Sequence, residues 1–293
     1  MKFAIFPNME KSVFYKLFPQ LADIFNELGI EYYLLDKYKK KAEEHNLFIE
    51  DKHYKSLEWI TSHVSYVMSI GGDGAYLAVA CTMADYPVAQ VGLHMGDFGF
   101  LNLISEKKLK ERMIQITQDD YILEKRFFLE SYLIHQDGTK KMLPIALNDV
   151  VVGHSAIGKM VRLHLHIDKQ FIQTYAADGI IISSPTGSTG YAMSCGGPVL
   201  PSDSKDFLVI PVCVHTGLTS PLIIPNNAEV KITLPEREKN VHISLDGTYT
   251  FQMASTDQLI IKNCLKQIRF IRFKDQGFFK ILTKKFENYE KKE

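Results

Sequence analysis

Apolar and polar positions along the first third of the chain predict strands and helices in alternation. Apolar residues at helical spacing over 13–28 predict a helix that ends at Gly29, with Pro19 expected to split it or to start a second helix. Further helices are expected over 75–84 and, capped by Ser105, to about Thr117. Short apolar runs predict strands at 2–6, 30–35, 64–70 and 88–92. This alternation indicates a parallel sheet covered by helices on both faces.

From about Tyr121 the pattern changes to short strands separated by Gly, Asp and Pro, with turns at Asp137-Gly138 and Asp168-Lys169. In 161–167 the apolar side chains share one strand face and Arg162, His164 and His166 share the other. The other strands are expected at 129–135, 150–152, 207–214, 230–234, 241–245, 258–264 and 268–272, and a last helix at 276–289. We therefore predict an α/β N-terminal domain, with a parallel sheet flanked by helices, and an antiparallel β-rich C-terminal domain.

Composition narrows the class of protein. The 293 residues include 34 Lys and Arg and 34 Asp and Glu, and 46% are hydrophobic, which excludes a disordered chain and argues against a nucleic-acid binder. The longest apolar run, 207–214, is interrupted by Pro211 and falls short of the roughly 20 residues of a membrane span. The apolar run at the N-terminus is too short for a signal peptide. Four cysteines without C-x-x-C spacing fit a reducing cytosol, so we expect a cytoplasmic protein with no membrane partner.

The tetrapeptide Gly71-Gly72-Asp73-Gly74 stands between an expected strand and an expected helix. Open α/β sheets bind ligands at the carboxyl ends of their strands, and glycines let the backbone approach a phosphate there. Phosphate repels a carboxylate unless that carboxylate binds a cation or a hydroxyl, so Asp73 is a candidate to contact a substrate hydroxyl or Mg²⁺. The alternative is a tight turn with a helix-capping Asp. The spacing matches neither a P-loop nor the G-x-G-x-x-G of dinucleotide folds.

A second candidate segment, D-G-I-I-I-S-S-P-T-G-S-T-G-Y, runs from Asp178 to Tyr191. A β-branched strand leads into a loop rich in hydroxyls and glycines, and a short helix is expected from Tyr191 until Gly196-Gly197-Pro198 stops it. Hydroxyls and backbone N–H groups at a helix start suit a ribose, an amide or a phosphate. A purely structural turn and cap would need few of these groups.

Other features are weaker. Asn148-Asp149 offers donors and acceptors suited to a diol or a base edge, but a plain turn is the simpler interpretation, as it is for Asp246-Gly247. His164 and His166 have no third metal ligand nearby in the sequence, so a solvated strand face explains them better than a metal site.

Together these motifs resemble the NAD kinase family, which carries a G-G-D-G loop, an N-E or N-D pair and D-G-x-x-x-S-x-P-T-G-S-T-x-Y in this order and at similar separations. Here they stand at 71–74, 148–149 and 178–191. The stretch Gly96-Asp97-Phe98-Gly99-Phe100-Leu101 is similar to the family's G-x-x-G-F-L, and 196–198 and 211–215 fit as well. The resemblance covers most of the chain, and the long third motif is its most specific part.

The resemblance implies an α/β domain of 1–121 with a returning C-terminal helix at 275–293, and a β-rich NAD-binding domain of 122–274. It implies ATP-dependent phosphorylation of the adenosine ribose 2′-hydroxyl of NAD, with Asp73 as the proton acceptor and a homodimer or homotetramer as the assembly. Mg²⁺, or another divalent cation, is expected with the ATP and not in a site built by the protein alone, Asp73 being the one protein group that could join it. The residues expected to contact NAD are Gly72, Gly74, Asn148, Asp149, Lys159, Asp178, Thr189, Gly190, Tyr191, Ala192, Met193, Ser194 and Thr248.

Some positions depart from the family pattern. Ala75 stands where the family usually has Thr, Gly190 replaces the usual Ala, and Thr248 stands where Gln is common. Lys159 occupies a variable ligand-facing position. None of these departures removes the carboxylate of Asp73.

Two other functions remain open at this point. Diacylglycerol and sphingosine kinases also resemble the chain at G-G-D-G, but such lipid kinases should carry a membrane-facing basic or apolar segment, and none is evident. A non-catalytic nucleotide sensor would bind phosphates better without a carboxylate beside them, so Asp73 argues against this function. The sequence leaves open whether the donor is ATP or polyphosphate and whether NADH is accepted.

Overall fold

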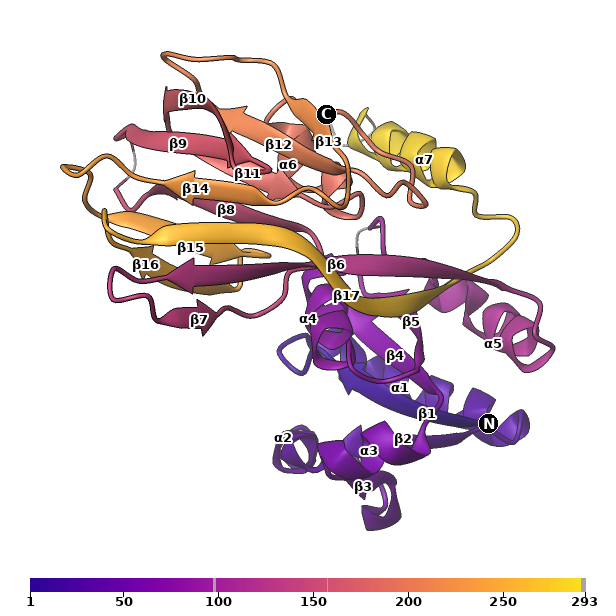
Figure 1. The fold of residues 1–293 in the computed structure, drawn as a ribbon. Helices are drawn as coiled ribbons and strands as arrows, with labels where there is room; N and C mark the ends of the chain where they lie inside the picture. Colours follow the sequence, from indigo (N-terminus) through magenta and orange to yellow (C-terminus); the bar gives the residue numbers. More distant parts are fainter. Residues whose placement is uncertain (97–98, 157, 291–293) are drawn as a thin grey trace. The chain divides into compact units, whose positions relative to one another are not determined.

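The computed structural model describes residues 1–96, 99–156 and 158–290, the last three of these by their backbone alone. The chain divides into two units (Figure 1): unit 1 is Met1–Lys125 with the C-terminal segment that starts at Ile268, and unit 2 is Arg126–Gln267. Two long strands, β6 (Ile122–Ile134) and β17 (Gln258–Arg272), each begin in one unit and end in the other. Asp97 and Phe98 of the predicted G-x-x-G-F-L stretch lie outside the described residues.

Unit 1 is built on a parallel sheet. The strand order is β17-β5-β4-β1-β2-β3, and every neighbouring pair is parallel. Five of the six residues of β1, and five of the six of β4, are buried, as expected for strands covered on both faces. The strands are β1 (Lys2–Pro7), β2 (Glu31–Leu35), β3 (Tyr54–Lys55), β4 (Tyr66–Gly71) and β5 (Ala89–His94), with the end of β17.

The predicted helices of unit 1 form with two corrections, and a short helix that the pattern did not predict lies at Leu57–His63. The helices of this unit are α1 (Ser12–Glu27), α2 (Lys39–Glu44), α3 (Leu57–His63), α4 (Asp73–Thr82), α5 (Leu109–Thr117) and α7 (Phe278–Glu290), with 3₁₀ turns at Asp36–Tyr38, Asp51–His53 and Glu106–Lys108. Pro19 does not split α1: a proline costs a helix about 3 kcal/mol, whereas α1 buries six large apolar side chains, each contributing about 1.5–3 kcal/mol. Ser105 makes no capping hydrogen bond, because a 3₁₀ turn separates it from α5.

Unit 2 consists of two antiparallel layers around a shared core, which confirms the predicted β-rich fold class. One layer has the strand order β10-β9-β14-β17, and β6 pairs with β17 and with β7. The strands of this layer not given above are β7 (Lys140–Met142), β9 (Val161–Ile167), β10 (Gln170–Ala177) and β14 (Val230–Thr233). The other runs β13-β12-β11-β8-β15-β16, formed by β8 (Asp149–His154), β11 (Gly179–Ser183), β12 (Phe207–Val212), β13 (Leu222–Ile224), β15 (Val241–Leu245) and β16 (Tyr249–Met253). Side chains from both layers, among them Leu163 and Ile182, are fully buried between them.

Details of unit 2 test the predicted strands and turns. Asp168-Lys169 joins β9 to β10 and Asp246-Gly247 joins β15 to β16, all four residues having positive φ, which confirms both turns. The strands predicted at 258–264 and 268–272 are one strand, β17. The apolar pattern breaks between them because Leu265 is 97% exposed, whereas β17 pairs with β14 before this break and with β5 after it. No helix within the described part of the chain has both the length and the apolar character needed to cross a membrane.

Candidate active site

The G-G-D-G loop lies at the carboxyl end of β4, and α4 begins at Asp73. Gly72 caps the helix in an extended conformation, and its carbonyl accepts hydrogen bonds from the N–H groups of Ala75 (3.1 Å) and Tyr76 (3.2 Å). No described atom lies within 4 Å of the position that a Cβ would take on Gly72 or Gly74. The loop is therefore open on the side of these glycines, at the N-terminal end of a helix, where backbone N–H groups lack intrahelical partners.

Asp73 is fixed by the loop that follows β5. Its Oδ2 accepts a hydrogen bond from the N–H of Phe100 (2.8 Å), and its Oδ1 accepts from the N–H groups of Leu101 and Asn102 (3.3 Å each) and from Asn102 Nδ2 (3.2 Å). A Cβ on Gly99 would stand 2.1 Å from Oδ1, so this approach requires glycine. The carboxylate thus joins two loops and does not cap α4. Among the residues that the structure describes, one N–H donates to Oδ2, so this oxygen keeps the capacity to accept one more hydrogen bond.

Asp246 organises the second group of predicted residues. Its carboxylate accepts hydrogen bonds from the N–H groups of Leu147 (2.8 Å), Asn148 (2.8 Å) and Asp149 (3.0 Å). The sequence alone suggests plain turns at Asn148-Asp149 and at Asp246-Gly247. Hydrogen bonds join these two dipeptides to each other. Sequence reasoning missed this role because an Asp-Gly turn looks the same whether or not its carboxylate binds a distant backbone.

The carboxyl group of Asp149 is partly protonated near neutral pH. It is 5% exposed, and burial, together with the negative charge of Asp246, raises the pKa of Asp149 to about 7. A carboxyl group in this state can donate as well as accept a hydrogen bond near neutral pH.

The third motif packs directly against Asn148. The Asn148 carbonyl accepts from the N–H of Ser184 (2.9 Å), and a Cβ on Gly187 would lie 2.2 Å from that carbonyl oxygen. Asn148 Oδ1 is buried and receives no hydrogen bond from any residue that the structure describes. A buried acceptor in this state points to a ligand donor, because leaving it unpaired is costly.

The third motif also forms the predicted short helix, α6 (Tyr191–Ser194), after a 3₁₀ turn at Gly187–Thr189. Tyr191 is exposed, and burial of part of its ring raises the pKa of its hydroxyl, with smaller contributions from neighbours that include Cys195 and Asp178. Ala192 is buried in a small cluster with Leu208, so its side chain faces the protein. A ligand at this position would meet the backbone of Ala192.

Thr248 and Lys159 are also predicted to contact NAD, and they differ in how they are linked to Asp246 and Asn148. Thr248 Oγ1 donates to the main-chain carbonyl of Asp246 (3.3 Å), the residue whose carboxylate accepts from the Asn148 N–H. The Lys159 N–H donates to the Ala156 carbonyl (3.4 Å), and nothing described ties its side chain to the others. Asp73 with Gly72 and Gly74 belongs to unit 1, and the other predicted contacts belong to unit 2.

Metal ligands and disulfides do not organise these sites. Within the ranges that the structure describes, no three His, Cys, Asp or Glu side chains gather in a way that could hold a metal ion. The four cysteines are free.

Comparison with solved structures defines the class of fold. Yeast NADH kinase in complex with NADH superposes with a TM-score of 0.84 at 18% identity, over 97% of this chain and 86% of that one. An NAD kinase from Archaeoglobus fulgidus in complex with ATP superposes with a TM-score of 0.74 at 20% identity, over 97% and 98%. At these identities the likeness establishes a shared fold.

Sequence comparison establishes the family. Residues 147–273 match the family model of the ATP-NAD kinase C-terminal domain. An NAD kinase from Escherichia coli O7:K1 is 30% identical over 241 residues, covering 82% of each chain, and one from Carboxydothermus hydrogenoformans is 27% identical over 262 residues, covering 86% of this chain and 93% of the relative. The chain belongs to the NAD kinase family, a family of phosphotransferases, which confirms the resemblance that its three motifs predicted.

Proposed function

We propose that the chain transfers a phosphoryl group from ATP to the adenosine ribose 2′-hydroxyl of NAD, giving NADP. Membership of the NAD kinase family supports the reaction. The observation that carries its assignment to residues is the Asp73 carboxylate, held by four hydrogen bonds at the carboxyl end of β4 with acceptor capacity left on Oδ2. That oxygen accepts the hydrogen bond of the ribose hydroxyl.

Asp73 acts by position more than by base strength. Phosphoryl transfer has a loose transition state, so alignment and charge neutralisation dominate the rate. A carboxylate is too weak a base to deprotonate a ribose hydroxyl beforehand. Asp73 orients the hydroxyl and accepts its proton late in the transfer, while the N–H groups of Phe100 to Asn102 hold the carboxylate in place.

The residues proposed to bind NAD supply the other polar contacts. Asn148 Oδ1, the buried acceptor, takes a donor from the dinucleotide, and Asp149 accepts or donates according to its charge state. Gly72 and Gly74 let the ligand approach the backbone of the G-G-D-G loop. The further proposed contacts are Lys159, Asp178, Thr189, Gly190, Tyr191, Ala192, Met193, Ser194 and Thr248.

Mg²⁺ fits this chain as an ion that arrives with the donor. Asp73 Oδ1 already accepts hydrogen bonds from three N–H groups. When bound with the donor, Mg²⁺ would neutralise part of the charge of its phosphates.

Several finer features belong to the same proposal. We propose a homodimer or homotetramer in the cytoplasm, supported by the family resemblance and by the cysteine usage. The domains proposed are 1–121 with 275–293, and 122–274. ATP is the proposed donor and polyphosphate the alternative to be tested.

Replacing Asp73 by Asn tests the assignment. Asp73→Asn keeps the shape and removes the proton acceptor, so kcat should fall at least roughly 100-fold while the Kd for NAD stays close to that of the wild type. NADP formation with ATP, NAD and Mg²⁺, followed in a coupled assay, gives kcat, and calorimetry gives the Kd. The matched control is Asp23→Asn, an exposed carboxylate on α1, which should leave both unchanged. Near-normal turnover of Asp73→Asn would refute the role of this residue.

A further inference from the structure

Asn102 lies buried beside the proposed catalytic carboxylate, one residue past the predicted G-x-x-G-F-L stretch. It is 0% exposed. Its side-chain Nδ2 donates to Asp73 Oδ1 (3.2 Å), and its main-chain N–H donates to the same oxygen (3.3 Å). Asn102 therefore holds Asp73 with both its backbone and its side chain.

A glycine in β5 makes room for the Asn102 amide. A Cβ on Gly92 would lie 2.1 Å from Asn102 Oδ1 and 2.8 Å from Asn102 Cγ. The same Cβ would lie 2.7 Å from Cδ2 of Tyr76 on α4. The Asn102 side chain thus packs against β5 at one end and contacts Asp73, the first residue of α4, at the other.

Backbone hydrogen bonds fix the main chain that follows Asn102. The Ile104 N–H donates to the Gly92 carbonyl (2.9 Å), and the Ile104 carbonyl accepts from the His94 N–H (2.9 Å). These bonds attach the segment after Asn102 to β5, the strand against which the amide packs.

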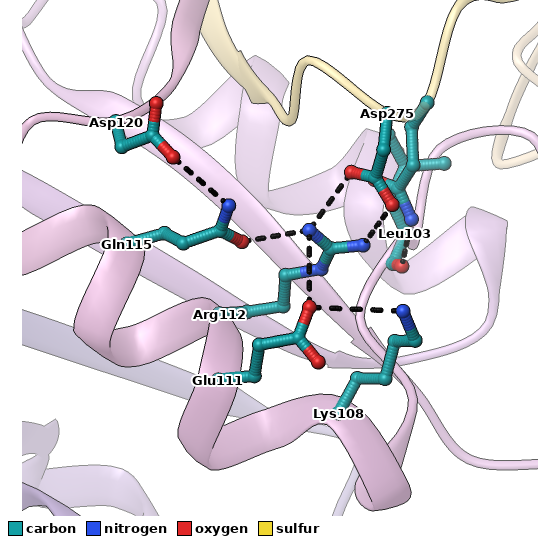
Figure 2. Close-up of polar contacts among 8 residues, drawn as sticks. Leu103, Lys108, Glu111, Arg112, Gln115, Asp120 and Asp275 are labelled. Atoms are coloured by element: carbon teal, nitrogen blue, oxygen red, sulfur yellow. Dashed lines mark hydrogen bonds and ion pairs between the residues drawn. The ribbon is translucent and has the colours of Figure 1, made fainter.

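The residue next to Asn102 is also linked to the segment that precedes α7 (Figure 2). The Leu103 carbonyl accepts a hydrogen bond from Gln276 Nε2 (2.9 Å). Asp275, the neighbour of Gln276, accepts from Arg112 through both carboxylate oxygens (2.8 and 2.6 Å), and the Arg112 side chain is 2% exposed. Asn102 therefore reaches Asp73 from a main chain that is anchored within unit 1.

The other end of the amide indicates that stability alone does not explain an asparagine at this position. A carboxylate only accepts hydrogen bonds, so the amide nitrogen faces Asp73 and Oδ1 lies at the other end, against Gly92. Asn102 Oδ1 is buried and receives no hydrogen bond from any residue that the structure describes. An unpaired buried acceptor is destabilising, and an apolar side chain of similar shape would not carry this cost. Because Asn102 has no exposed surface, a ligand cannot pair with this oxygen.

We infer that Asn102 is a positioning residue for phosphoryl transfer. Its amide fixes Asp73 Oδ1, which fixes the rotation of the carboxylate and therefore the direction in which Oδ2 is presented to the ribose hydroxyl. The inference rests on the proposed function, since Asn102 acts only through Asp73. A displacement of about 1 Å at a reacting group can cost roughly 100-fold in rate.

Two substitutions at Asn102 remove the amide and keep the main-chain N–H. Asn102→Leu fills the space of the side chain, and Asn102→Ala leaves it empty, so a loss shared by both comes from the missing donor and not from packing. Each should lower kcat for NADP formation by roughly 10–100-fold and leave the KM and the calorimetric Kd for NAD close to those of the wild type, because the buried side chain touches no ligand.

The matched control is Asn26→Leu, the same exchange at an exposed position of α1, which should leave kcat unchanged. Circular dichroism confirms that each variant is folded, and Asn102→Ala decides the matter if the leucine variant does not fold. Wild-type kcat in either folded Asn102 variant, or a loss that appears only as weaker NAD binding, would overturn the inference.

A double variant distinguishes positioning from a purely structural role. Asp73→Asn combined with Asn102→Leu should turn over as slowly as Asp73→Asn alone, because the first substitution already removes the carboxylate through which Asn102 acts. A residue needed only for folding would lower kcat by the same factor in both backgrounds, and that result would overturn the inference.

The wild-type assay separates this inference from the proposed function. If the wild type forms NADP and an Asn102 variant keeps its kcat, the positioning role fails and the proposed function stands. If the wild type forms no NADP from ATP or polyphosphate, the proposed function fails and the positioning role fails with it.

Discussion

Single side chains in this protein connect segments that are far apart in the sequence. Asp246 binds three consecutive N–H groups nearly a hundred residues earlier, and Asp73 binds a loop that follows the next strand. The sequence identified Asp73 and Asn148-Asp149 as candidates because their residue types and motif context are local. It could not predict their partners, since an N–H donor carries no signature in the amino-acid sequence. The assignment of these residues to catalysis and NAD binding stays a prediction.

The charge state of Asp149 should make stability depend on pH. Its pKa is raised from 3.8 to about 7 by burial and by Asp246, so between these values the folded chain keeps a proton that the unfolded chain has released. The free energy of unfolding therefore falls as pH rises through this window and levels off above about pH 7. Asp149→Asn lacks this dependence.

The corresponding measurement is urea unfolding of both proteins at about pH 5 and about pH 8. Relative to the wild type, Asp149→Asn should gain roughly 2–3 kcal/mol at most between the two values. Comparing the change in each protein cancels the contributions of all other titrating groups. A constant difference between the two proteins at both pH values would contradict the raised pKa.

Gly187 should tolerate no side chain. A Cβ there would stand 2.2 Å from the Asn148 carbonyl oxygen, and two backbone segments would have to separate. Gly187→Ala should lose about 1–3 kcal/mol of unfolding free energy. The matched control is Gly190→Ala, whose Cβ would lie 3.3 Å from the nearest atom and requires a shift of only a few tenths of an ångström. Urea denaturation of both variants measures the contrast, and equal stability of the two would show that the Asn148 segment can yield.

At the scale of elements, the periodic spacing of apolar residues predicted helices and strands that are buried in the core. It missed a strand whose residues are exposed. The apolar face of α1 and the buried strands β1 and β4 are visible in the sequence because their burial repeats. β7 was not predicted, since all three of its residues are exposed and only pairing with β6 makes it a strand. The predicted fold class is confirmed because the long, buried elements determine it.

The ion pair between α5 and the segment before α7 should be energetically coupled. The hydrogen bonds from Arg112 lower the pKa of Asp275, so its contribution to stability is present near neutral pH and is lost as pH falls below the ordinary value of 3.8. Asp275 is half exposed, which limits the gain. A double-mutant cycle with Arg112→Met and Asp275→Asn should give about 1–2 kcal/mol of coupling at neutral pH.

The exposed pair Lys274–Asp120 provides the control for that cycle. Its side chains are 67% and 40% exposed, so Lys274→Gln and Asp120→Asn should couple more weakly than Arg112→Met and Asp275→Asn. Thermal or urea unfolding of the variants gives both coupling energies. Equal coupling in the two cycles would mean that burial of the Arg112 guanidinium does not strengthen its ion pair.

At the scale of the whole molecule, the proposed reaction predicts that NAD binding and phosphoryl transfer depend on different residues. NAD is proposed to bind the folded chain, so at 100 times its Kd it should stabilise that chain by about 2.7 kcal/mol. Asp73→Asn should show the same stabilisation as the wild type, because the residue is proposed to act in phosphoryl transfer and not to carry NAD affinity. Asn148→Ala should lose most of it, because Asn148 Oδ1 is the buried acceptor proposed to take a donor from the dinucleotide. Unfolding each protein with and without NAD measures the three shifts, and full stabilisation of Asn148→Ala would remove that residue from the binding site.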